Sequence, residues 1–130
     1  MPPDLFVDRS LGGIAVPGWF KQHWPAKVRT LDEVYGMAKV EDTEWMSRAD
    51  HEGWVAVCKD DRIRTRPGER QLMSGGALRV FCLANGNLLR AAMVDRFHSN
   101  LDAMLAQAEM PGPWLFAVYT HHIERMKLYG

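Results

Sequence analysis

Residues 54–64, with the sequence WVAVCKDDRIR, decide how this chain folds. They begin as a continuous apolar run of strand length, which is typical of a strand that is buried on both faces of a parallel sheet. The apolar run then gives way to a lysine, two aspartates and two arginines. We therefore predict a buried strand over 54–58 that brings charged side chains to one edge of a sheet.

Similar strand and helix signals alternate along the rest of the chain. The expected strands are 4–8 (DLFVD), 27–31 (KVRTL), 54–58, 78–83 (LRVFCL) and 114–119 (WLFAVY), with an antiparallel sixth within 120–128. The expected helices are 17–24, 42–52 capped by Asp42, a short one ending at Met73, and 87–108 capped by Asn87, with 32–40 as a loop. This alternation predicts an α/β fold of three layers, α/β/α, with a mainly parallel central sheet.

The composition limits the class of protein. A length of 130 residues, 47% hydrophobic and 25% charged, fits one compact domain over 1–130. The formal net charge is zero, which excludes nucleic-acid binding by a uniformly basic surface. However, residues 41–52 carry five acids and one base, and residues 53–86 carry six bases and three acids. The net charge of zero is therefore the sum of an acidic segment and a basic segment that follow each other in the chain.

Other features indicate a cytoplasmic protein without a membrane anchor. No apolar run approaches the length of a membrane span, and the first ten residues lack the basic and apolar regions of a secretory signal. Cys58 and Cys82 are the only cysteines, and both lie inside apolar runs. This placement favours two buried thiols in a reducing compartment, with a single disulfide as the alternative.

Acidic and amide side chains follow three of the predicted strands. Asp8 ends the first strand, and Asn85 follows the fourth. Asp60 and Asp61 follow the third. In a parallel sheet these positions share one edge, where such folds bind ligands. Converging carboxylates without histidine or cysteine are typical of a Mg²⁺ or Mn²⁺ site for phosphodiester hydrolysis, and Asp42 joins them if its helix starts on the same side.

Each of these acids also has a structural interpretation. Asp42 would cap its helix, and Asp60 and Asp61 would be turn residues. Asp8 would form an ion pair with the neighbouring Arg9. On spacing alone, the structural interpretation and the metal site both stay open.

A basic segment follows the third predicted strand, and its basic residues are Lys59, Arg62, Arg64, Arg66 and Arg70. Arginine side chains bind phosphate oxygens through two parallel hydrogen bonds, so these residues and Arg9 are candidates for holding a nucleic-acid backbone. The alternative is a solvated loop whose arginines pair locally with Asp60, Asp61 and Glu69.

Three segments together resemble the PIN-like domain family, and specifically its VapC-type toxin branch. They are LFVDRSLGG (5–13), EDTEWMSRADHEGWVAVCKDDRIR (41–64) and LRVFCLANGNL (78–88). The resemblance rests on an acid that ends the first strand, an acid that opens a helix, and a K-D-x-R-I-R pattern after the third strand. It implies a Rossmann-like fold and a Mg²⁺- or Mn²⁺-dependent ribonuclease that cleaves cellular RNA and is inhibited by a cognate antitoxin.

The resemblance also implies roles for individual residues. Asp8, Asp42 and Asp60 match the acidic positions of the family and are the expected catalytic residues. The same three, together with Asp61, are the expected metal ligands, and Glu44 is an alternative ligand. The expected RNA-binding residues are Arg9, Lys59, Arg62 and Arg64.

One position departs from the family pattern. Most PIN nucleases have a further acid near the end of the fourth strand, where this chain has Asn85 and Asn87. An amide brings no charge, so we expect weaker binding of a divalent ion than at a four-acid site. The leading interpretation is a toxin ribonuclease, for which the resemblance also implies a homodimer. The alternatives are a PIN-like scaffold that binds RNA or a protein without catalysis, and a nuclease that acts on DNA or tRNA.

Overall fold

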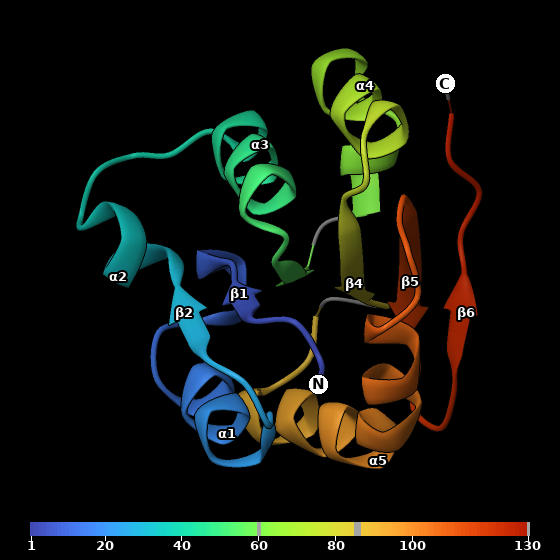
Figure 1. Cartoon of the computed structure of the whole chain (residues 1–130). Coiled ribbons are helices and arrows are strands. Elements are labelled where there is room, and N and C mark those ends of the chain that lie inside the picture. The colour runs from blue at the N-terminus through green and yellow to red at the C-terminus, as the bar shows by residue number, and fades with distance from the viewer. Residues whose placement is uncertain (60, 85–86, 130) are drawn as a thin grey trace.

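The computed structural model describes residues 1–59, 61–84 and 87–129, with the backbone but not the side chain of Asp61. Within them the strands form one sheet in the order β2-β1-β3-β4-β5-β6 (Figure 1). The strands are β1 (Leu5–Val7), β2 (Val28–Thr30), β3 (Val55–Cys58), β4 (Arg79–Leu83), β5 (Trp114–Val118) and β6 (Ile123–Arg125). β1 to β5 pair in parallel, whereas β6 runs antiparallel to β5. The predicted mainly parallel sheet is therefore confirmed.

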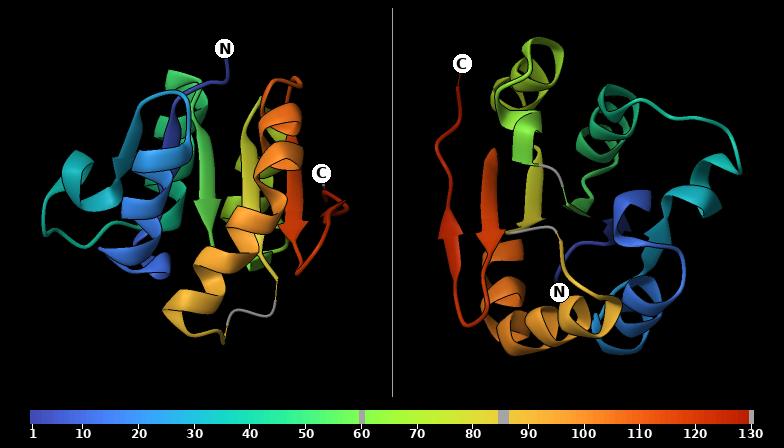
Figure 2. Two further views of the ribbon diagram at one scale, coloured as in Figure 1. Left: turned by 90° about the horizontal axis from the view of Figure 1, so that it is seen from below. Right: turned by 180° about the vertical axis from the view of Figure 1, so that it is seen from behind.

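Helices cover both faces of this sheet, so the chain forms the predicted three layers (Figure 1 and Figure 2). On one face lie α1 (Ala15–His23) and α5 (Arg90–Ala108). On the other lie α2 (Leu31–Tyr35), α3 (Asp42–Glu52) and α4 (Pro67–Gly75). Two short 3₁₀ helices, η1 (Arg9–Leu11) and η2 (Asp61–Arg64), follow β1 and β3. In the described part of the chain, no helix has the length and apolar character needed to cross a membrane.

The alternating side chains of β1 join the two halves of the core. Leu5 and Val7 pack in the layer of α1 and α5, whereas Phe6 packs in the opposite layer with α3. The Phe6 ring stacks on Trp45, at 5.5 Å between ring centroids, and on Trp54, at 5.8 Å. Burying an apolar side chain of this size contributes about 1.5–3 kcal/mol. This packing fixes β1, and with it the polar residues at its two ends.

The predicted loop over 32–40 is wrong at its start, where α2 forms. The Thr30 side chain accepts a hydrogen bond from the backbone N–H of Glu33, at 3.1 Å. In return, the Glu33 carboxylate accepts one from the backbone N–H of Thr30, at 3.0 Å. This capping box stabilises a helix of five residues. A helix this short has no apolar periodicity to reveal it in the sequence.

Two predicted helix caps are also wrong. α3 spans 42–52 as predicted, but Glu41 occupies its cap position and Asp42 lies in its first turn. The carboxylate of Asp42 instead binds two side chains, that of Trp45 in the same helix and that of Arg66 before α4. α5 starts at Arg90 with Leu89 in the cap position, so Asn87 lies outside the helix.

Candidate active site at the carboxyl edge of the sheet

Asp8 directly follows β1 and is fixed to the sheet by its backbone. Its N–H donates to the carbonyl of Val57 in β3, at 2.9 Å. Its carboxylate oxygen Oδ2 accepts hydrogen bonds from the hydroxyl of Ser10, at 2.6 Å, and from the backbone N–H of Ser10, at 3.3 Å. Asp8 thereby caps η1, and Ser10 holds the carboxylate in one orientation.

Asp42 is held through both of its carboxylate oxygens. Oδ1 accepts a hydrogen bond from the indole N–H of Trp45, at 2.9 Å. Oδ2 accepts one from the guanidinium of Arg66, at 3.1 Å. Trp45 is buried against Phe6 and is therefore a rigid donor. Arg66 also forms an ion pair with Glu69 on α4, as the interpretation of local pairing predicts.

The two aspartates lie close enough to influence each other. Burial raises the pKa of Asp8, and the negative charge of Asp42 raises it further. The hydrogen bonds from Ser10 act in the opposite direction. The fold therefore retains a carboxylate at Asp8 although burial and the nearby charge of Asp42 both oppose its ionisation. Such costly arrangements are concentrated at functional sites, and a cation between the two carboxylates would remove both penalties.

The other predicted ligands are not tested by the structure. Asp60 and Asn85 lie outside the described residues, as does the side chain of Asp61. Among the residues that are described, no group of three or more His, Cys, Asp or Glu side chains is arranged to hold a metal ion. The charge of Asp42 acts on Asp8, and the assignment of the acidic residues as metal ligands stays a prediction.

Glu44, the alternative ligand, lies beside α2. It lines a cavity together with Tyr35 of α2. Burial raises the pKa of the Tyr35 hydroxyl, and the negative charge of Glu44 adds to this effect. Residues two apart on a helix point in different directions. This explains why the Glu44 side chain lines the cavity beside Tyr35 and does not point the same way as the Asp42 side chain.

The predicted RNA-binding arginines have structural partners. Arg9 donates to the carboxylate of Asp32, at 2.9 and 2.6 Å, and to two backbone carbonyls of residues 36–38, both at 3.2 Å. The structural interpretation of Asp8, an ion pair with Arg9, is therefore wrong, because Arg9 pairs with Asp32. Arg64 donates to the carbonyl of Lys127, at 3.2 Å. RNA contacts of Arg9, Arg64, Lys59 and Arg62 remain predictions.

Sequence reasoning missed the residues that orient the two aspartates. Ser10 stands two residues after Asp8, a spacing at which a side chain commonly bonds to an aspartate in a turn. Trp45 stands three residues after Asp42, where helical side chains are neighbours. Both contacts could have been proposed from spacing. The contact of Arg66 spans 24 residues along the chain, and no local pattern predicts it.

Comparisons with known proteins agree with this geometry. The model of a family described as "PIN like domain" matches residues 3–85. Over 125 residues the chain is 30% identical to the putative ribonuclease VapC45 of Mycobacterium tuberculosis, a match that covers 94% of this chain and 90% of that protein. No solved structure matches the chain. The sheet order, the acids at its carboxyl edge and these matches together show that the chain belongs to the PIN-like domain family, in its VapC-type branch.

Proposed function

We propose that this chain is a metal-dependent endoribonuclease, the toxin of a type II toxin–antitoxin pair. The observation that carries the proposal is that the buried carboxylate of Asp8 follows β1 at the ligand-binding edge of a parallel sheet, where the negative charge of Asp42 acts on it. The name of the relative from Mycobacterium tuberculosis, a putative ribonuclease, supports RNA as the substrate class.

The described residues fit a divalent cation. Carboxylate oxygens are the hard ligands that Mg²⁺ and Mn²⁺ prefer. A cation would also relieve the burial and the repulsion that raise the pKa of Asp8. Trp45 keeps Asp42 oriented, and Arg66 is the group with which a cation would have to share the other oxygen. We therefore assign Asp8 and Asp42 as ligands of Mg²⁺ or Mn²⁺.

The remaining ligands are proposed from their place in the sequence. Asp60 and Asp61 follow β3, the strand that pairs with β1. Asn85 follows β4 and stands where the family usually has its fourth acid. With an amide in that place the site has one negative charge fewer, so we expect it to bind the cation weakly.

A bound divalent cation would polarise the phosphodiester and favour ionisation of the attacking water. The protein contributes the fixed geometry around it. Ser10 and Trp45 hold the two carboxylates in place, so little reorganisation is needed when the substrate arrives. Lys59 and Arg62 follow β3 at the same edge of the sheet. We expect them to bind phosphate oxygens, which positions the RNA without reading its sequence.

Several further features belong to the proposal. The VapC-type relative supports a cognate antitoxin as partner, and we also expect a homodimer. Cys58 and Cys82 are buried and not joined by a disulfide, which is consistent with the cytoplasm. The matched family model ends at residue 85, but β5 continues the sheet by pairing with β4. The pairing of β5 with β4 supports a single PIN-like domain over 1–130.

The test is RNA cleavage by the purified chain, free of its partner, in millimolar Mn²⁺. Asp8→Asn should lower the rate by more than about 100-fold, since even groups that only orient a metal ligand change activity by about 10–100-fold. The matched control is Asp102→Asn, which removes an exposed carboxylate on α5 and should leave the rate unchanged. Circular dichroism of each variant checks the fold.

Equal rates for Asp8→Asn and the parent would show that the site is misassigned. RNA binding without any cleavage in Mn²⁺ would instead support the alternative function, a PIN-like scaffold that has lost catalysis.

A further inference from the structure

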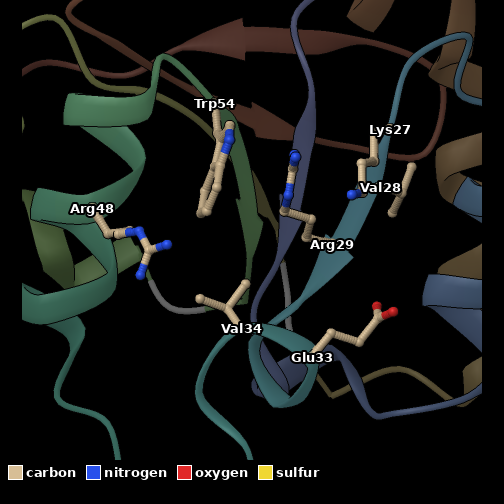
Figure 3. Close-up of a pocket in the computed structure, with 7 residues that line it drawn as sticks. All are labelled: Lys27, Val28, Arg29, Glu33, Val34, Arg48 and Trp54. Carbon is tan, nitrogen blue, oxygen red and sulfur yellow. The ribbon is translucent and has the colours of Figure 1, made fainter.

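A second polar pocket lies between β2, α2 and α3, and neither Asp8 nor Asp42 lines it (Figure 3). Its volume is about 410 Å³. Three cationic side chains line it, Lys27, Arg29 and Arg48, together with the ring of Trp54 and a single acid, Glu33. The pocket therefore gathers positive charge next to an aromatic ring.

Both arginines of the pocket lie against the indole ring of Trp54. The guanidinium carbon of Arg29 is 4.9 Å from the centroid of the ring, and that of Arg48 is 5.6 Å from it. Trp54 is only 6% exposed and stacks on Phe6, so the ring is fixed in the core. In the view of Figure 3 the ring is drawn between the two arginines. Each cation is attracted to the ring, and an anion in the pocket would offset the positive charge that the ring and the neighbouring acids leave unbalanced.

The acids near this pocket are already engaged by other groups. The carboxylate of Glu33 accepts hydrogen bonds from Lys21, at 2.9 Å, and from the backbone of Thr30, at 3.0 Å. The bond from Lys21 is the main reason why the pKa of Glu33 is lowered. Asp4 binds Arg29 through a single guanidinium nitrogen, at 2.7 Å. A guanidinium has five N–H donors, so this ion pair orients Arg29 and leaves it able to donate to a ligand.

Arg48 and Lys27 are held more loosely. The Nε atom of Arg48 is 3.6 Å from the carboxylate of Glu52, and both side chains are largely exposed. This distance is longer than a hydrogen bond, and exposed ion pairs of this kind contribute little free energy. Lys27 is exposed at the start of the edge strand β2. The Lys27 side chain can therefore turn toward an anion at low cost, whereas Arg48 is held over Trp54 and near the Tyr35 hydroxyl, where it lines the pocket.

We propose that this pocket binds a phosphate group of the RNA backbone, outside the carboxylate site. The inference rests on the proposed function, because it identifies the anion with the ribonuclease substrate. Guanidinium groups match phosphate oxygens through paired hydrogen bonds. The pocket is a second contact that lengthens the footprint of the substrate on the protein.

The distance to the carboxylate site fits one continuous RNA segment. Asp42 and Arg48 lie on the same helix, and a rise of about 1.5 Å per residue puts them about 9 Å apart along its axis. A strand of duplex DNA carries a phosphate about every 3.4 Å of helix axis, so a few nucleotides of RNA span this axial separation. An extended acidic peptide spans it equally well, so the choice of RNA as the occupant rests on the ribonuclease function proposed above.

The experiment measures RNA binding in a chelator, where cleavage is suppressed. The probe is a fluorescein-labelled single-stranded RNA of mixed sequence, about 30 nucleotides long, and anisotropy gives the affinity across a salt series. The test variant combines Lys27→Ala with Arg48→Ala. The matched control combines Arg125→Ala with Lys127→Ala, which also removes one arginine and one lysine beside aromatic rings, at the opposite edge of the sheet.

We expect the test variant to bind RNA about 5- to 10-fold more weakly than the wild type at low salt. The slope of log K against log salt should become shallower by about 0.7 for each phosphate that the variant no longer binds. The control should keep the wild-type slope. An unchanged slope in a test variant that keeps the wild-type circular dichroism spectrum would overturn the inference.

An oligoglutamate peptide, titrated in parallel, tests the alternative that the pocket binds an acidic protein segment instead of RNA. Peptide binding that needs Lys27 and Arg48, with an unchanged RNA slope, would overturn the RNA assignment in favour of an acidic protein segment. Failure of the proposed function gives a different result. In that case the wild type cleaves no RNA in Mn²⁺, although the salt slope still depends on the two cations.

Discussion

The two ends of β1 carry aspartates that the fold treats in opposite ways. Asp4 precedes the strand and binds Arg29, and this hydrogen bond is the main reason why the pKa of Asp4 is lowered. Asp8 follows the strand, and its pKa is raised by burial and by the negative charge of Asp42. Three buried residues separate them. The same residue type is therefore stabilised as an anion at one end and opposed as an anion at the other.

The difference separates a structural aspartate from a functional one. At the amino end, Asp4 helps to hold Arg29 at the edge strand β2, so its charge is balanced within the protein. At the carboxyl end, Asp8 receives hydrogen bonds from the neutral Ser10 and lies within range of the negative charge of Asp42. The fold retains an unfavourable charge arrangement there, which is the expected signature of a site completed by a cation.

The largest effect is expected from the second carboxylate, Asp42. Asp42→Asn should lower Mn²⁺-dependent RNA cleavage by more than about 100-fold, for the same reason as Asp8→Asn. Glu44→Gln is the matched control on the same helix and should cleave at the wild-type rate, because Glu44 lies beside Tyr35. Rate measurements under single-turnover conditions check both variants. If Glu44→Gln loses activity and Asp42→Asn does not, Glu44 is the metal ligand, and the contrast drawn between Asp4 and the pair Asp8 and Asp42 is wrong.

A smaller effect is expected from the group that orients Asp42. Trp45→Phe keeps an aromatic ring stacked against Phe6 but removes the indole N–H that donates a hydrogen bond to Asp42. We expect the affinity for Mn²⁺ to fall by about 10-fold and the free energy of unfolding to fall by about 1 kcal/mol. Calorimetry and urea denaturation measure the two quantities.

The control for this variant is Trp114→Phe. Trp114 is also buried, and its indole N–H donates to the carbonyl of Met110, at 3.1 Å, far along the chain from the acids. It should show a similar loss of stability and no loss of Mn²⁺ affinity. If both variants lose Mn²⁺ affinity equally, Trp45 has no specific role in orienting the site.

The smallest effects concern stability without metal, and they should have opposite signs at the two ends of β1. The folded pKa of Asp4 lies below the ordinary value for an aspartate, so its ionised form stabilises the fold above that ordinary value. Asp4→Asn should therefore lower the free energy of unfolding at neutral pH, by about 0.5 kcal/mol for a partly exposed ion pair. This loss should fade as the pH falls through the folded pKa of Asp4.

For Asp8 the sign is reversed. Its folded pKa lies above the ordinary value for an aspartate, so ionisation removes stability as the pH rises through the interval between the unfolded and folded values. In chelator at neutral pH, Asp8→Asn should raise the free energy of unfolding, and the gain should disappear below the unfolded pKa. Urea denaturation at several pH values measures both variants. Two changes of the same sign at neutral pH would contradict the contrast between the two aspartates.

Most of the fold could be predicted because it depends on local apolar patterns. The run at 54–58 and the similar run at 114–119 are buried strands, within one residue of the predicted ends. Cys58 and Cys82 are buried on neighbouring strands and not joined by a disulfide, as their apolar surroundings indicated. α2 was missed because its stability comes from one capping box and not from periodicity.

The candidate site was predictable only in part. The rule for parallel sheets predicted that Asp8 lies at the carboxyl edge, and that Asp42 joins it if its helix starts on the same side. It could not reveal which donors hold them, since the bond from Arg66 depends on how α4 packs against α3. The role of Arg29 could not be predicted either, because Arg29 and its partners Asp4 and Trp54 come from three different parts of the chain.

The most direct test of the central claim is calorimetric titration of Mn²⁺ into the purified chain and its two β1 variants. The account predicts that the wild type and Asp4→Asn bind Mn²⁺ in the millimolar range or tighter, with equal affinity, and that Asp8→Asn loses this binding. Equal binding by all three proteins, or loss of binding in Asp4→Asn alone, would contradict a metal site at the carboxyl end of β1.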